Sequence, residues 1–316
     1  MRGNPVKFSI VTPCFDRPGF LGEAIRSVLS QEGDFEIEYV IQNGGEDKDV
    51  LRILRSWKQS VEDGDFKGGC RKIEFRYYLE KDAGMYDAIG RGFSRTNGDI
   101  LAWLNSDDLY HPNAFQTVAD ILRQFEKIQW LTGLPCLYNE KGSIIYIDRS
   151  MPSFSREFVR CGYYNRKFLD FGLSWIQQES TFWRRALWEL AGSGTMDAYR
   201  YAGDFHLWKA FAEHAPLVRV HSLLGGIRKH KDQLTRQLDR YYEEIEETGR
   251  PPLGLKVLRH MVRSFPFLRG TIYRRWAGRV FLGMIGLKRE WVLGEAVQWA
   301  FSKDREWHHN KRKGIF

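Results

Sequence analysis

Residues 80–112 read EKDAGMYDAIGRGFSRTNGDILAWLNSDDLYHP, and this stretch decides the fold. MYDAIGRGFSR (85–95) is typical of a helix, and ILAWLN (100–105) is a short apolar run typical of a buried strand. The acidic pair Asp107 and Asp108 follows that strand directly. Helix, buried strand and polar loop in this order predict one unit of a parallel α/β sheet, whose ligands bind at the carboxyl ends of the strands.

The same alternation extends toward the N-terminus. Residues 7–12, 37–42 and 72–79 are predicted strands, and helices are predicted after Asp16, which can cap, and over 49–57 and 112–125. Beyond Phe125 the alternation weakens: residues 130–148 predict two strands around a turn, with helical stretches near 183–191 and 203–213. The pattern therefore predicts a mixed, mainly parallel sheet flanked by helices.

Charge divides the 316 residues into two parts. Residues 251–316 hold 14 basic and 4 acidic side chains, which leaves 34 basic and 36 acidic side chains for residues 1–250. The tail mixes Arg with Trp and Leu and follows Pro251–Pro252, so we expect a basic amphipathic helical extension after a domain that ends near residue 250. Such a tail either lies on an anionic membrane surface or packs on the protein itself. Nucleic acid is not an expected partner, because no nucleic-acid-binding signature accompanies the charge.

Cysteines and apolar runs bear on location. Cys14, Cys70, Cys136 and Cys161 have no spacing typical of a zinc cluster or a disulfide framework. The first residues lack the apolar core of a signal peptide, and no apolar run approaches the length of a membrane span. We therefore expect a cytoplasmic protein, with a possible peripheral position on the inner face of the cell membrane.

Polar loops follow four predicted strands. Thr12 and Pro13 follow the first, Asn43 the second, Asp82 the third, and Asn105 to Asp108 the fourth. Each loop alone is equally typical of an ordinary turn. In a parallel sheet the four loops converge, and adjacent carboxylates at such an edge suit a hard cation, Mg²⁺ or Mn²⁺.

With these motifs in place, the chain resembles the family 2 glycosyltransferases of the GT-A fold. The resemblance rests on SIVTPCFDRPGFLGEAIRSVLSQ, EYVIQNGG, the stretch quoted above, and QQESTFWRRALWELAG with YAGDFHLW, over roughly residues 7–235. It implies a nucleotide-binding half at about 1–128 and an acceptor half at about 129–250. It also implies a nucleotide-sugar donor, a divalent metal and inversion at the anomeric carbon.

The resemblance assigns roles by position. Asp107 in NSDD would bind Mn²⁺ or Mg²⁺, together with His230. Asp204 would be the catalytic base, although an acid at a predicted helix start also suits a capping role. Glu179 would bind the acceptor. The residues that would bind the nucleotide sugar are Thr12, Pro13, Phe15, Arg17, Asn43, Asp82, Asn105, Ser106 and Asp108.

The expected activity is that of an inverting, metal-dependent hexosyltransferase. Its donor would be a nucleotide sugar, with a UDP-sugar favoured, and its acceptor a hydroxyl of a glycan or a lipid-linked sugar in bacterial surface polysaccharide synthesis. Asn43 and Asn105 stand where the family more often has Asp. Two alternatives stay open: a sugar nucleotidyltransferase, although no glycine-rich triphosphate loop follows the first strand, and a catalytically decayed scaffold docked at the membrane.

Overall fold

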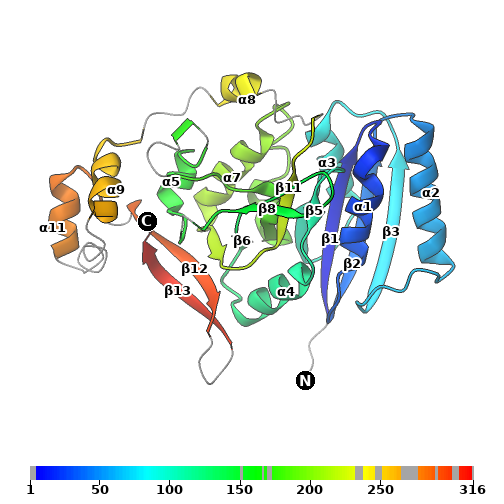
Figure 1. Cartoon of the computed structure of the whole chain (residues 1–316), viewed down its shortest axis with the longest axis horizontal. Helices are drawn as coiled ribbons and strands as arrows, with labels where there is room; N and C mark the ends of the chain where they lie inside the picture. Colours follow the sequence, from blue (N-terminus) through cyan, green and yellow to red (C-terminus); the bar gives the residue numbers. More distant parts are fainter. Residues whose placement is uncertain are drawn as a thin grey trace.

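The computed structural model describes residues 5–149, 152–165, 167–168, 173–231, 238–245, 251–264, 277–288, 291–300 and 306–314. Within these ranges one long sheet runs through the molecule (Figure 1). Its strands, in spatial order, are β13 (Trp307–Gly314), β12 (Leu293–Trp299), β10 (Val218–Val220), β6 (Trp130–Thr132), β9 (Thr181–Arg184), β4 (Ile100–Trp103), β1 (Val6–Cys14), β2 (Phe35–Asn43) and β3 (Lys72–Leu79). The mixed, mainly parallel sheet expected from the sequence is confirmed.

The N-terminal half of the sheet is parallel and in register. Cys14 at the end of β1 pairs with Asn43 at the end of β2, and Asn43 pairs with Leu79 at the end of β3. β4 pairs with β1 in the same direction. The four carboxyl ends therefore meet along one edge, as the alternating sequence pattern predicted.

Four helices cover the faces of this half. They are α1 (Pro18–Leu29), α2 (Lys48–Glu62), α3 (Met85–Ser94) and α4 (Ala114–Gln124). Pro18 opens α1, but Asp16 does not cap that helix. Its Oδ1 instead accepts a hydrogen bond from the Asp47 backbone N–H at 2.7 Å, so it ties the first loop to the start of α2.

The C-terminal half turns the sheet from parallel to mixed. β9 runs antiparallel between β4 and β6. Behind it α5 (Arg156–Arg160), α6 (Arg185–Ala191) and α7 (Gly203–His214) pack around an aromatic cluster in which Trp103 stacks on Trp208 at 5.8 Å between ring centroids. The 3-10 turn η2 (Gln178–Ser180) leads directly into β9. This aromatic core fixes the start of α7 relative to the end of β4.

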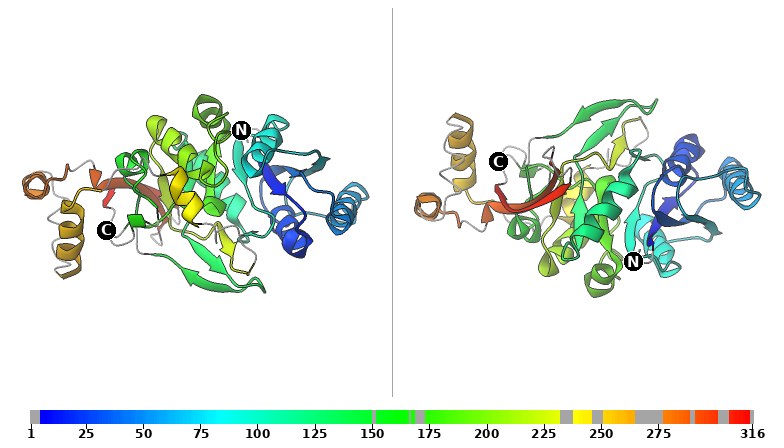
Figure 2. Two further views of the ribbon diagram at one scale, coloured as in Figure 1. Left: turned by 90° about the horizontal axis from the view of Figure 1, so that it is seen from above. Right: turned by 90° about the horizontal axis from the view of Figure 1, so that it is seen from below.

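A second, smaller sheet stands beside the edge where the strands end. Its order is β5 (Leu109–Tyr110), β11 (Gly225–Arg228), β7 (Cys136–Tyr138) and β8 (Ile144–Ile147). The turn between β7 and β8 is where the sequence predicted it, and the pair projects from the body of the molecule (Figure 2). β11 connects this sheet to the loop after β4, because it pairs with β5.

Residues 251–316 differ from the expected helical tail. α9 (Gly254–Ser264) and α11 (Ala277–Met284) are helices, but β12 and β13 form an antiparallel pair and β12 joins β10 in the main sheet. Val292, Ala296 and Val297 are buried there. Residues 293–299 and 307–314 therefore lie in strands, and this pair of strands extends the main sheet. α9 and α11 lie at the end of the molecule opposite α1 and α2 (Figure 1).

Candidate active site

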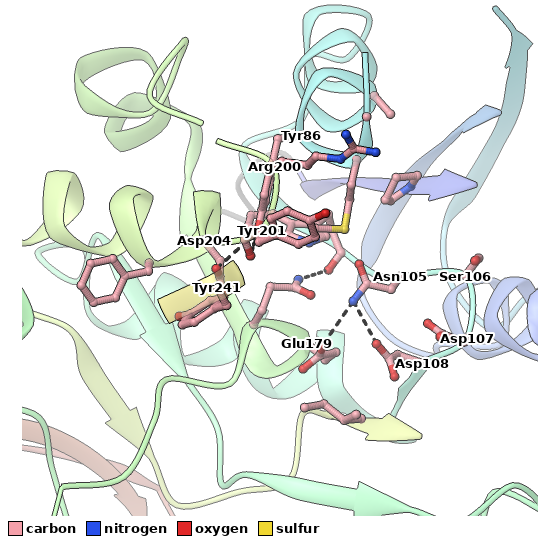
Figure 3. A pocket seen from close by; sticks show the side chains of 18 of the residues that line it. Tyr86, Asn105, Ser106, Asp107, Asp108, Glu179, Arg200, Tyr201, Asp204 and Tyr241 are labelled. Carbon is pink, nitrogen blue, oxygen red and sulfur yellow. Dashed lines mark hydrogen bonds between the residues drawn. The ribbon is translucent and has the colours of Figure 1, made fainter. Parts of the chain in front are cut away.

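A cavity of about 590 Å³ opens at the carboxyl ends of β1, β3 and β4. It lies between the two halves of the fold, since its wall combines loops of the parallel half with η2 and the start of α7 (Figure 3). The residues predicted from the sequence that line it are Pro13, Phe15, Arg17, Asp82, Asn105, Ser106, Asp107, Asp108, Glu179 and Asp204. The fold therefore brings most of the predicted site together.

The loop after β4 is held by side chains that reach it from η2 and β11. Asn105 Nδ2 donates to Asp108 Oδ2 at 3.0 Å and lies 3.3 Å from Glu179 Oε1. Asp108 Oδ1 accepts the Arg228 backbone N–H at 2.8 Å. Burial, and then the charges of Asp107 and Glu179, raise the pKa of Asp108 well above its usual range. The Asp108 side chain therefore stabilises the conformation of the loop after β4.

Arg228 supports the same loop from below. Its side chain is fully buried, and it donates to the backbone carbonyls of Asp107 at 3.0 Å and Glu140 at 2.7 Å. A third donation, from Nη2, goes to Glu23 Oε2 at 2.7 Å. These contacts commit Arg228 to shaping the loop after β4.

Asp107 and His230 form a pair of potential metal ligands. His230 Nε2 lies 2.9 Å from Asp107 Oδ2, and the His230 ring packs on Phe20. Across the described ranges, no group of three or more His, Cys, Asp or Glu side chains has the arrangement of a metal cage. A carboxylate and an imidazole suit Mn²⁺ or Mg²⁺ when phosphate and water oxygens complete the coordination, so the two residues fit an ion that arrives with a diphosphate.

Glu179 occupies the middle of the cavity wall. Burial raises its pKa to about 7, and the charges of Asp204 and Asp107 act in the same direction. Within the described part of the chain, the buried atoms Glu179 Oε2, Asn105 Oδ1 and Gln178 Oε1 have no hydrogen-bond partner. Buried polar atoms without partners are rare in folded proteins. All three belong to residues that line the cavity, where a polar ligand could bind them.

Asp204 stands across the cavity from Asp107, at the start of α7 (Figure 3). The Tyr86 hydroxyl lies 3.3 Å from Asp204 Oδ1 and 3.2 Å from the Tyr201 carbonyl. Gly203 makes this closeness possible, because a Cβ there would lie 2.8 Å from carbons of the Tyr86 ring. Burial raises the pKa of Asp204 to about 6. The N-cap of α7 is Ala202, so Asp204 is free of the capping position that its sequence context also suggested.

Three predicted residues do not line the cavity: Thr12, Asn43 and His230, of which His230 contacts the lining residue Asp107. Thr12 is buried and its Oγ1 lies 2.8 Å from the Tyr39 hydroxyl, while Asn43 Nδ2 donates to the Gly45 carbonyl at 2.8 Å. Asn43 thereby shapes the loop that meets Asp82. Asp82 itself accepts the Gly84 backbone N–H at 3.0 Å and packs against Gly44, where a Cβ would collide with its carboxylate.

Sequence reasoning missed the aromatic wall of the cavity beside Asp204. Trp175, Tyr201, Tyr241 and Tyr242 line the cavity next to Asp204, and Arg200 joins them. Tyr241 and Tyr242 come from α8 (Leu238–Glu244), which lies outside the stretches that carried the resemblance. Their only sequence signal was the aromatic pair in DRYYEE, which a solvent-exposed helix would show as well.

Comparison with known proteins agrees with this architecture. The sequence model of glycosyl transferase family 2 matches residues 9–186. Uncharacterized glycosyltransferases of Rickettsia typhi and Rickettsia conorii are 23% and 26% identical over 75% of the chain; the chain covers 69% of the first and only 36% of the second. An Escherichia coli UDP-Gal:alpha-D-GlcNAc-diphosphoundecaprenol beta-1,3-galactosyltransferase is 24% identical over 39% of the chain and 41% of its own length.

Among solved structures, Staphylococcus aureus TarS residues 1–349, in complex with UDP-GlcNAc, superimposes with a TM-score of 0.51 at 15% identity. The match covers 88% of this chain and 80% of the TarS chain. At this identity the likeness concerns the fold. The arrangement of sheet and helices is therefore that of a GT-A glycosyltransferase.

Proposed function

The chain belongs to glycosyl transferase family 2, a family of nucleotide-sugar-dependent glycosyltransferases, and on this premise we propose that it is an inverting, metal-assisted enzyme. Its donor would be a UDP-sugar and its acceptor a hydroxyl of a glycan or a lipid-linked sugar. The observation that carries the proposal is one cavity with Asp107, which contacts His230, on one side and the Asp204 carboxylate on the other.

In the proposed reaction Asp204 is the general base. The acceptor oxygen forms a bond to the anomeric carbon while the bond from that carbon to the diphosphate oxygen breaks, and the leaving diphosphate takes the electron pair. The acceptor proton goes to Asp204. A carboxylate whose pKa is about 6 is ionised at neutral pH and is still a competent base, which suits this role.

On the donor side, Pro13 near the end of β1 and Phe15 and Arg17 after it border the cavity with Asp82, where a nucleoside would lie. Asp107 and His230 would hold Mn²⁺ or Mg²⁺ beside the diphosphate. Bound there, the ion would offset the negative charge of the departing diphosphate. Asn105 and Gln178 offer unpartnered amide oxygens to the sugar hydroxyls.

The acceptor assignment rests on the wall beside Asp204. Tyr201, Tyr241 and Trp175 present ring faces together with polar edges, as expected for a site that binds a sugar ring. The Escherichia coli relative is named for a diphosphoundecaprenol-linked acceptor. By analogy, we place this chain in bacterial surface polysaccharide synthesis, at the cytoplasmic face of the membrane.

Calorimetry tests the donor half of the proposal. Purified protein is titrated with UDP, GDP, dTDP and CDP, each with Mn²⁺ and with EDTA. We expect UDP to bind in the presence of Mn²⁺ and to lose most of its affinity in EDTA. Equal binding of UDP in both conditions would contradict the metal, and absence of all nucleotide binding would favour the decayed scaffold.

A further inference from the structure

The segment that leads into α7 is held by hydrogen bonds to the side chain of Glu244, which lies about 40 residues later in the sequence. Glu244, the last residue of α8, accepts three backbone N–H groups through its carboxylate. Oε1 accepts from Arg200 at 3.0 Å, and Oε2 accepts from Tyr201 at 2.9 Å and from Ala202 at 2.8 Å. Three charge-assisted hydrogen bonds on one carboxylate make a strong and directional contact.

This contact holds the segment just before α7, up to and including its N-cap residue. Ala202, the N-cap residue of α7, offers no side-chain oxygen to the free amides at the helix start. The positive end of the helix dipole at the same place favours a negative group. Glu244 binds the N–H of Ala202 and of the two residues before it, so it orders the turn that leads into α7, and Asp204 follows in the first turn.

Other contacts of α8 converge on the same turn. The Glu244 carbonyl lies 3.1 Å from His206 Nε2, and Arg240 donates to the Tyr201 hydroxyl at 2.8 Å. Ile245 is buried in a small apolar cluster with Ala202 and Phe205. The helix thus docks specifically on residues 200–206 and does not merely cover them.

The docked helix also faces the cavity. Tyr241 and Tyr242 line it next to Asp204, and the Tyr241 ring lies beside the Asp204 carboxylate (Figure 3). One short helix therefore links the aromatic acceptor wall to the turn that carries the proposed base.

We propose that Glu244 is a positioning residue for glycosyl transfer: its carboxylate fixes residues 200–202 and so aligns Asp204 with the acceptor wall that α8 builds. The proposal rests on the function proposed above, in which Asp204 is the base. Glu244 touches neither substrate nor reacting atoms in this role. It acts through the backbone that presents Asp204.

Glu244 also acts on Asp204 through its charge. The groups around Asp204 are Tyr86 from α3, Glu179 from η2, Arg200 and Tyr201 before α7, and Tyr241 and Glu244 from α8. Burial is the main cause of the raised pKa of Asp204, and the negative charge of Glu244 contributes in the same direction. Removing that charge should therefore lower the pKa of Asp204.

Hydrogen exchange tests the contact between Glu244 and residues 200–202 without any substrate. Glu244→Gln keeps an oxygen that can accept two of the three amides, whereas Glu244→Ala keeps none. The matched control is Glu243→Gln, which removes the same charge from an exposed neighbour on the same helix. We expect amide exchange in the peptide that covers residues 199–207 to accelerate at least tenfold in Glu244→Ala, less in Glu244→Gln, and not at all in Glu243→Gln. Unchanged exchange in Glu244→Ala would overturn the proposal.

Kinetic measurements then test whether the contact between Glu244 and residues 200–202 contributes to the reaction. The assay follows UDP release from UDP-glucose, UDP-galactose and UDP-GlcNAc with Mn²⁺ and water as acceptor. In both Glu244 variants we expect kcat to fall at least tenfold with the donor KM unchanged, and the acid limb of the pH profile to move to lower pH. Glu243→Gln should match the wild type in kcat and in pH profile.

The outcomes separate the two proposals. Glu244→Gln could show faster amide exchange while its kcat and the acid limb of its pH profile stay at the wild-type values. Glu244 would then have only a structural role, and its positioning role would be overturned. A wild-type protein that releases UDP from none of the three donors contradicts the proposed function. The assignment of Asp204 as base falls with it, and exchange alone then decides whether Glu244 holds the turn.

Discussion

Asp204 is a carboxylate that the fold holds at a pKa of about 6, above the usual range of Asp, because burial disfavours its charged form. A base must be ionised, so activity should fall as the pH drops through 6. We expect Asp204→Asn to abolish transfer at every pH while it leaves calorimetric UDP binding intact. Wild-type turnover in this variant would disprove the base assignment.

The same burial predicts an effect on stability. Between the ordinary pKa of Asp and about 6, the folded state binds more protons than the unfolded state, so ionisation of Asp204 destabilises the fold as the pH rises through this window. Asp204→Asn should therefore stabilise the protein by about 1–2 kcal/mol at pH 8. At pH 4 its melting temperature should approach that of the wild type. A uniform shift across this pH range would contradict the linkage.

Asp107 has a different role, because its carboxylate meets His230 and not an internal partner of the loop. We expect Asp107→Ala to weaken UDP binding in Mn²⁺ by about tenfold or more and to remove the effect of EDTA. Asp65→Ala, at an exposed position between α2 and β3, is the control and should bind UDP as the wild type does. Retention of EDTA sensitivity in Asp107→Ala would place the metal elsewhere.

At the level of elements, the first turn of α7 is an assembly point. α3 brings Tyr86 against it, α8 brings Glu244, and Gly203 leaves the space that Tyr86 requires. Gly203→Ala would put a Cβ 2.8 Å from the Tyr86 ring and push the turn outward. We expect a loss of about 1–3 kcal/mol of stability by denaturant unfolding, with at least tenfold lower kcat.

A matched glycine on α3 provides the control for that change. A Cβ at Gly90 would meet nothing nearer than Asp197 Oδ1 at 3.9 Å, so Gly90→Ala should keep wild-type activity. It should gain up to about 1 kcal/mol of stability, because alanine favours a helix interior. Equal effects of the two substitutions would show that close packing at Gly203 is not what matters.

At the scale of the whole molecule, β12 and β13 belong to the main sheet. β12 pairs with the edge of β10, and Val292 and Val297 are buried, so the pair of β12 and β13 is part of the sheet. We expect a chain that ends at residue 288 to melt at least about 5 °C below the full chain, because it loses several buried side chains and exposes a strand edge. An unchanged melting temperature would mean that the hairpin is an appendage.

α9 and α11 are the part of the basic region that suits a membrane surface. Leu253, Val257 and Met284 are exposed, and Lys256 and Arg263 are exposed on the same helix as Val257. Across the described ranges, none of the helices has the length and apolar character needed to span a bilayer. Apolar side chains flanked by cations at one end of the molecule are typical of a peripheral contact.

Vesicle sedimentation tests this contact. We expect the protein to bind vesicles that contain phosphatidylglycerol and to dissociate from them in high salt. It should not bind vesicles of pure phosphatidylcholine. Leu253→Asp should reduce binding several-fold. Leu190→Asp, at another exposed leucine, on α6, should not. Equal loss in both variants would show that the contact is not specific to α9.

The sequence alone determined the parallel half of the sheet and the loops that end its strands. Strand and helix periods differ, so their alternation can be read locally, and polar residues after each strand must meet at one edge. Asp82, Asn105 and Asp107 were therefore placed at this edge without coordinates, whereas Asp204 came from the resemblance to the family. The hairpin over 293–314 was not, because its aromatic and basic residues also suit an amphipathic helix and only pairing with β10 selects the strand.

Tertiary structure decided which polar residues face the cavity and which hold it in shape. Thr12, Asn43 and Arg228 have the residue types of a binding site but lie buried as supports, and nothing local to their sequence distinguishes the two roles. Glu244 is the opposite case, an acid in an ordinary charged run that meets three amides about 40 residues away. Contacts between distant segments depend on the packing of the whole chain, and the charge and polarity of single residues do not encode them.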